Sequence, residues 1–152
     1  MVQRASRAHV RVGDDVIASI GAGLLVLVGV AEGDDPADAS YLAAKIARLR
    51  IMQDADGRMN HSVLDAGGGV LLVSQFTLIA DTRKGRRPSF TRAAQPEAAQ
   101  LLLQQLATEL EELGVQVRSG RFGASMDVEL VNTGPVTIVL DSADRHTPRQ
   151  QA

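Results

Sequence analysis

Cysteine is absent from the 152-residue chain, so two classes of structure are excluded at once. Without thiols the protein can form neither disulfides nor thiolate metal sites. The longest apolar run, from Leu24 to Val30, is far too short to span a bilayer. The first residues also lack the basic and apolar regions of a signal peptide. We therefore expect a soluble, cytoplasmic protein that has no contact with a membrane.

An excess of charge of one sign is also lacking, because the formal net charge is only -2 at pH 7. This balance argues against a protein that coats nucleic acid non-specifically. No internal repeat or low-complexity tract is evident, and 45% hydrophobic residues suffice for one ordinary core. The composition predicts a single domain, followed by a polar tail over residues 142–152 that we expect to be disordered.

The hydrophobic pattern predicts both strands and helices. Alternating apolar residues and the turn residues that follow Val12 predict an opening hairpin. The run that begins at Leu24 is apolar on both faces, as in a central strand. Asp35 and Pro36 are an N-cap and first residue of a helix, and a second helix runs from Pro96 to Gly114. Further strands are expected at 70–78, 115–118, 127–130 and 138–140.

Three motifs that suggest a metal or phosphate site have simpler explanations. The acidic residues from Glu32 to Asp35 cap a helix. Residues 54–57 partly match a calcium loop but lack its third acidic position and closing glutamate, so they predict a turn. Residues 67–69 are glycines without the Lys-Ser/Thr of a P-loop. His9 has no second ligand at usable spacing. We expect no metal and no cofactor.

A Gly-Pro pair lies between two segments of strand character, at Gly134 and Pro135. Proline gives no N–H to a ladder and glycine allows backbone angles closed to other residues. The pair must therefore form a turn, a bulge or exposed main chain, and the pattern alone favours a hairpin turn. The functional alternative is that two carbonyl groups, unshielded at Gly134, face a ligand or a partner subunit.

An apolar run from Val70 ends in the polar side chains of Ser74, Gln75 and Thr77, which surround Phe76. Such groups are costly inside a core unless each has a partner. Ser74 and Thr77 lack a Gly-x-Ser-x-Gly elbow and a nearby His-Asp pair. Gln75 and the main-chain N–H groups around Phe76 and Thr77 could instead bind a carbonyl oxygen or an amine. The alternative is that polar residues merely end a strand.

A basic loop follows this segment, with five of the sixteen basic residues between positions 83 and 92. They are Arg83, Lys84, Arg86, Arg87 and Arg92. A solvated surface loop and a contact surface for a phosphate backbone both explain such a cluster.

Four stretches of the sequence together resemble the D-aminoacyl-tRNA deacylase family. They are 74–77 (Ser-Gln-Phe-Thr), 87–90 (Arg-Pro-Ser-Phe), 120–126 (Gly-Arg-Phe-Gly-Ala-Ser-Met) and 132–137 (Asn-Thr-Gly-Pro-Val-Thr). Gln3-Arg4 and residues 20–25 also match, so the resemblance covers residues 1–141. One departure is Ala5-Ser6, where a branched residue is commoner in the family.

The resemblance implies a homodimer of mixed α/β subunits, with a barrel-like sheet and two main helices packed outside it. Gly134-Pro135 would be cis and would enter the partner's site to face the catalytic segment from Ser74 to Thr77. Arg4 would hold this loop by bonding across the interface. The other implied substrate-binding residues are Asn132, Thr137, Phe90 and Met126, of which the last two would shape an adenosine pocket.

The implied reaction is hydrolysis of the ester bond in D-aminoacyl-tRNA, and of glycyl-tRNA mischarged on tRNA(Ala). Arg83, Lys84, Arg86 and Arg87 would contact the acceptor end of the tRNA, and no DNA partner is expected. Two mechanisms stay open: Thr77 acts as a nucleophile, or the protein positions water and the terminal ribose 2′-OH. A non-catalytic RNA-binding or chiral-sensing dimer is the alternative function.

Overall fold

The computed structural model describes residues 1–149. The helices are α1 (Pro36–Arg48), α2 (Val63–Ala66) and α3 (Pro96–Glu112), with short 3-10 segments η1 (Phe76–Ile79) and η2 (Ser142–His146). The strands are β1 (Val2–Val12), β2 (Asp15–Ile20), β3 (Gly23–Val28), β4 (Met52–Gln53), β5 (Met59–His61), β6 (Gly69–Ser74), β7 (Gln116–Ser119) and β8 (Asp127–Ile138). Within residues 1–149, none of the helices is long and apolar enough to cross a membrane.

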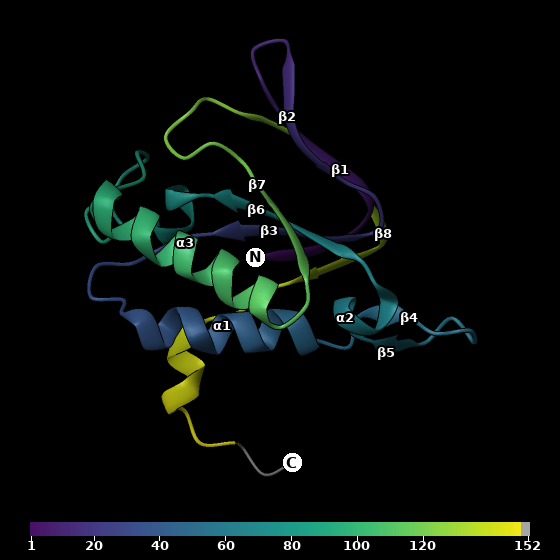
Figure 1. Ribbon diagram of the computed structural model, residues 1–152. Coiled ribbons are helices and arrows are strands. Elements are labelled where there is room, and N and C mark those ends of the chain that lie inside the picture. The colour runs from purple at the N-terminus through teal and green to yellow at the C-terminus, as the bar shows by residue number, and fades with distance from the viewer. Residues whose placement is uncertain (150–152) are drawn as a thin grey trace.

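The main sheet has the order β2-β1-β3-β6-β7. Strand β8 lies off this path and also pairs with β1. Strand β1 is antiparallel to β2, β3 and β8, whereas β3, β6 and β7 run parallel. The strands curl into a barrel-like sheet, and α1 and α3 lie side by side against one face (Figure 1). The predicted mixed α/β fold with two main helices outside the sheet is confirmed.

Both faces of the sheet are buried. One core lies between the sheet and the two main helices and includes Leu24, Val70, Ile46 and Leu110. The second lies on the concave face, where Leu25 and Leu71 are packed against partly buried side chains from β8. Strand β3 contributes to both cores, as expected of a run that is apolar on both faces.

Helix α1 begins as its sequence predicts. The Asp35 side chain accepts a hydrogen bond from the Asp38 N–H, and the Asp38 carboxylate accepts one from the Asp35 N–H. Pro36 occupies the first turn, where its missing N–H costs nothing. This capping box accounts for the acidic stretch that could have been taken for a metal site.

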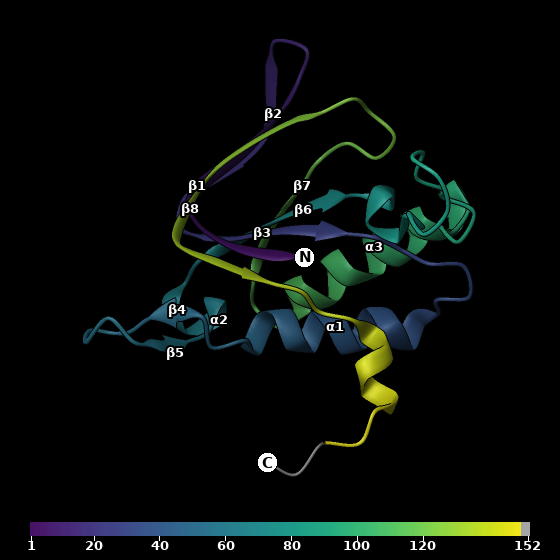
Figure 2. The same cartoon turned by 180° about the vertical axis from the view of Figure 1, so that it is seen from behind.

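The C-terminal tail differs from the prediction of disorder. Residues Ser142–His146 form η2, which lies against α1 (Figures 1 and 2). Arg145 lies 3.3 Å from an Asp38 oxygen and 3.5 Å from an Asp35 oxygen. The polar composition that suggested disorder here supplies ion pairs with the first turn of the helix. Positions 150–152 of the expected tail lie outside the described residues.

Candidate active site

A cavity of about 600 Å³ lies at the carboxyl end of β6, where several predicted site residues meet. All three phenylalanines of the chain line it, namely Phe76, Phe90 and Phe122. Ser74, Gln75 and Met126 line it as well, and so do Gln95 and Pro96 at the start of α3. In a chain with only 3% aromatic residues, this gathering indicates a surface suited to a planar ligand.

The Phe90 side of the cavity is held by main-chain hydrogen bonds. Glu32 N–H donates to Arg92 C=O at 2.8 Å, and Ala94 N–H donates to Val30 C=O at 2.9 Å. The ring of Phe90 meets that of Phe76 edge to face, with centroids 5.1 Å apart and planes at 74°. The two rings therefore have a fixed relative orientation, although Phe76 is 56% exposed.

The segment from Ser74 to Thr77 leaves the sheet earlier than predicted. The expected strand over 70–78 ends at Ser74, and Phe76–Ile79 form η1. Gln75 makes the last bond to the neighbouring strand, from its N–H to Val28 C=O at 2.8 Å. The N–H groups of Phe76 and Thr77 make no hydrogen bond within residues 1–149, because they begin a 3-10 helix. Of these two residues, Phe76 lines the cavity.

Thr77 itself does not line the cavity. Its hydroxyl accepts a hydrogen bond from the Gln75 side-chain amide. Among the described residues that line the cavity, none carries an ionisable side chain. The lining of the cavity thus supplies no side-chain base, and the hydrogen-bond partner of the Thr77 hydroxyl is a neutral amide.

Gly134-Pro135 is not the hairpin turn that the pattern favoured. Strand β8 continues through it, and the peptide bond is cis. Gln3 pairs with Thr137 and Ala5 pairs with Asn132, so three extra residues of β8 bulge out of the ladder. The φ of Gly134 is +134°, and a Cβ there would lie 2.8 Å from Arg4 Nη2 and from a Val136 methyl. Only glycine fits this position.

Two polar side chains hold the bulge. Asn132 accepts a hydrogen bond from Val136 N–H at 2.7 Å and donates to Val136 C=O and the Thr137 hydroxyl. Arg4 is 6% exposed; its Nε donates to Thr133 C=O at 2.8 Å and its Nη1 to Ile51 C=O at 2.9 Å. Both bonds lie within the chain, because Thr133 belongs to β8, the neighbour of β1, and Ile51 immediately precedes β4. The expected bond of Arg4 across a subunit interface stays a prediction.

The bulge and the cavity lie at opposite ends of the sheet within one chain. Arg4, beside the bulge, is opposite Leu24, which is opposite Val70 of β6. Ser74 is four residues further along β6, or about 13 Å at the rise of a strand. A single chain therefore does not bring Gly134-Pro135 to the segment from Ser74 to Thr77.

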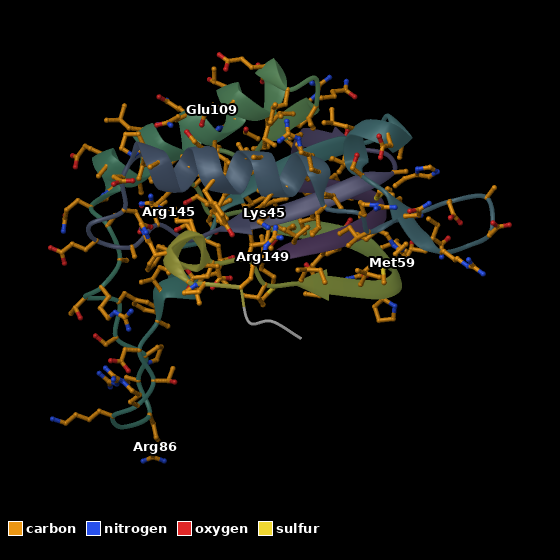
Figure 3. The ribbon with its side chains drawn as sticks, turned by 90° about the horizontal axis from the view of Figure 1, so that it is seen from below. Lys45, Met59, Arg86, Glu109, Arg145 and Arg149 are labelled. Atoms are coloured by element: carbon orange, nitrogen blue, oxygen red, sulfur yellow. The ribbon has the colours of Figure 1, made fainter. Side chains whose placement is uncertain are left out.

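The basic loop projects from the body of the molecule near the start of α3, with Arg86 at its far end (Figure 3). Arg83, Lys84, Arg86 and Arg87 are all exposed. The Arg83 guanidinium donates to both oxygens of Asp81, at 2.9 and 2.7 Å. This pairing holds the pKa of the Asp81 carboxyl below its usual value.

Other residues that line the cavity were not assigned to a site from the sequence. Phe122, Gln95 and Pro96 are the main examples. Phe122 carried a usable signal, because it is one of only three phenylalanines and lies in a matched motif. The described residues hold no group of three or more histidines or acidic residues that could bind a metal.

The family model described as D-Tyr-tRNA(Tyr) deacylase matches residues 1–141. The chain belongs to this family. A D-aminoacyl-tRNA deacylase of Roseiflexus sp. (strain RS-1) is 59% identical over 151 residues, which cover 99% of this chain and 97% of the relative. One from Thermomicrobium roseum is 58% identical and covers 95% of this chain and 94% of its own.

Two solved structures share the fold of this deacylase-family chain. The c-Myc DNA Unwinding Element Binding Protein is 37% identical, with a TM-score of 0.87 over 92% of this chain and 95% of its own. A probable eukaryotic D-amino acid tRNA deacylase has a TM-score of 0.74 over 88% of this chain and 93% of its own. At 15% identity, the second likeness concerns the fold alone.

Proposed function

We propose that this protein hydrolyses the ester bond of D-aminoacyl-tRNA and releases the D-amino acid and the tRNA. The observation that carries the proposal is the phenylalanine-lined cavity, which has unpaired main-chain N–H groups beside it and no ionisable lining residue. The rings suit the terminal adenosine, with Phe90 and Met126 shaping its pocket, and the N–H groups suit an ester carbonyl. Membership of the deacylase family supports the same reaction.

The reaction that fits this site relies on positioning. Water attacks the ester carbonyl carbon, and the N–H groups of Phe76 and Thr77 stabilise the negative oxygen of the tetrahedral intermediate. The bond to the ribose oxygen then breaks, and that oxygen leaves with the proton that the attacking water gives up. The vicinal hydroxyl of the terminal ribose assists the attacking water, because no side chain in the cavity can act as a base.

A homodimer would complete this site. Gly134 and Pro135 are exposed and rigidly held, yet far from Ser74 in their own chain. A partner subunit could present its bulge to the cavity so that the two carbonyl groups face the α-carbon of the substrate. Asn132 would then fix the shape of the bulge, and Thr137 would form its base.

Exposed cations of the basic loop would hold the acceptor end of the tRNA. Lys84, Arg86 and Arg87 are exposed and form no ion pair within residues 1–149. The loop leads through Ser89 directly into Phe90, so a tRNA bound by the loop would place its 3′ end at the cavity.

Selection between D and L substrates would follow from what the carbonyl groups of Gly134 and Pro135 can exclude. An L side chain would clash with the Gly134 and Pro135 carbonyl oxygens, whereas a D side chain would point into open solvent. Many D side chains should therefore be accepted at similar rates. Glycine has no side chain to clash, so glycyl-tRNA, including that mischarged on tRNA(Ala), should also be hydrolysed.

The test compares D-tyrosyl, D-aspartyl, glycyl and L-tyrosyl esters on tRNA. We expect release of the first three amino acids and sparing of the L ester. Efficient cleavage of the L ester, or strong selectivity among D side chains, would refute exclusion by these two carbonyl groups. Binding of D-aminoacyl-tRNA without any release would instead identify a non-catalytic sensing module.

A further inference from the structure

We propose that Asp81 withdraws Arg83 from the tRNA-binding surface and uses it to brace the base of the basic loop. Arg83 is then a positioning residue, and Lys84, Arg86 and Arg87 carry the contacts to phosphate. This inference rests on the proposed function for the nature of the ligand, whereas the brace itself rests on contacts within the chain.

The first observation is how the loop is closed. Asp81 and Ser89 form a two-bond bridge, with Asp81 N–H donating to Ser89 C=O at 2.8 Å and Ser89 N–H donating to Asp81 C=O at 2.9 Å. The seven residues between them are all exposed, and Gly85 has a φ of +72° with no atom within 4 Å of its Cβ position. Within residues 1–149, the loop makes no hydrogen bond to the rest of the chain beyond its base.

The second observation is how Arg83 pairs with Asp81 at that base. Its main-chain N–H donates to Asp81 Oδ1 at 3.0 Å, while Nε and Nη2 donate to Oδ1 and Oδ2. This bidentate pairing is the strong and geometrically specific form of an arginine–carboxylate contact. Within the described chain, Lys84, Arg86 and Arg87 have no such carboxylate partner.

The consequence is electrostatic. A cation that binds a phosphate releases condensed counterions, and each such contact adds about 0.7 to 0.9 to the slope of log affinity against log salt. The Asp81–Arg83 pair carries no net charge, so Arg83 should add nothing to this slope. The four basic side chains between positions 83 and 87 should thus behave as three in binding.

The experiment measures tRNA binding by fluorescence anisotropy across a salt series. Arg86→Ala should flatten the slope by about 0.7 to 0.9, whereas Asp81→Asn combined with Arg83→Ala, which removes the neutral pair and leaves no charge behind, should keep the wild-type value. Asp81→Asn should make the slope steeper by a similar amount, because Arg83 is released. Arg48→Ala, which removes an exposed cation from the last turn of α1, is the matched control.

Hydrogen–deuterium exchange tests the brace without a ligand. The main-chain amides from Arg83 to Ser89 should exchange faster in both Arg83→Ala and Asp81→Asn than in the wild type or Arg48→Ala. A slope that drops in the combined Asp81→Asn and Arg83→Ala variant as much as in Arg86→Ala, or loop exchange that does not change in either single variant, would overturn the inference. Absence of D-aminoacyl-tRNA hydrolysis by the wild type would overturn the proposed function, and the exchange result would still decide the brace.

Discussion

Replacing Arg4 with methionine should destabilise the protein and displace the carbonyl groups of the bulge. Arg4 is 6% exposed and donates to two carbonyls on separate segments, Thr133 and Ile51. A hydrogen bond from a charged donor contributes about 1.5–3 kcal/mol, and its loss leaves each carbonyl without that partner. Methionine keeps most of the apolar stem, so the loss should come chiefly from the two bonds.

The two bonds do not contribute their full sum, because the wild type also bears the cost of burying the guanidinium charge. We therefore expect a loss of about 3 kcal/mol in the free energy of unfolding. For a chain of this length, each kcal/mol lowers Tm by roughly 2–4 °C, which gives a fall of about 6–12 °C. The stability of Arg4→Lys should lie between those of the wild type and Arg4→Met, because a single ammonium cannot match the forked geometry of a guanidinium.

The assay is urea unfolding followed by circular dichroism, at one fixed protein concentration because a dimer would make the midpoint depend on it. Arg7→Met is the matched control, since Arg7 lies on the same strand but is exposed. Hydrolysis of D-aminoacyl-tRNA should also fall more in Arg4→Met than in the control. An Arg4→Met protein as stable as Arg7→Met would refute the view that Arg4 fastens the bulge to the chain around Ile51.

Three further expectations follow. Thr77→Ala should retain substantial deacylase activity, because the hydroxyl lies outside the cavity lining and is bonded to the neutral Gln75 amide; loss of all turnover in a folded variant, or a trapped acyl-enzyme, would contradict this. Arg86→Ala combined with Arg87→Ala should raise KM for aminoacyl-tRNA but leave hydrolysis of a short aminoacyl-adenosine nearly unchanged; equal losses on both would place these residues in folding or catalysis. The pKa of Asp38 is lowered chiefly by the Asp35 N–H, so its stabilising effect is present above the unfolded pKa of about 3.9 and lost as pH falls through the lower folded value. Asp38→Asn should therefore reduce the fall in urea midpoint below about pH 4, and an unchanged acid dependence would refute its role.

The sequence by itself determined the elements whose signals are local. Asp35 as the N-cap and Pro36 in the first turn marked the start of α1, because a cap acts within one turn. The run that begins at Leu24 marked a central strand, because burial on both faces requires apolar residues throughout. The motifs at 74–77 and 132–137 also pointed to the residues of a site and to a family.

Tertiary structure alone decided how those residues meet. The bulge at Gly134-Pro135 depends on pairing between β1 and β8, which are more than a hundred positions apart, and no local pattern distinguishes a bulge from a turn. The carbonyls that Arg4 binds, those of Thr133 and Ile51, are likewise distant from it in the sequence. Arg145 of η2 also forms ion pairs with Asp35 and Asp38, about a hundred positions before it. In each case the deciding contact joins segments that are distant in the chain. The local sequence around either segment therefore carries no signal of that contact.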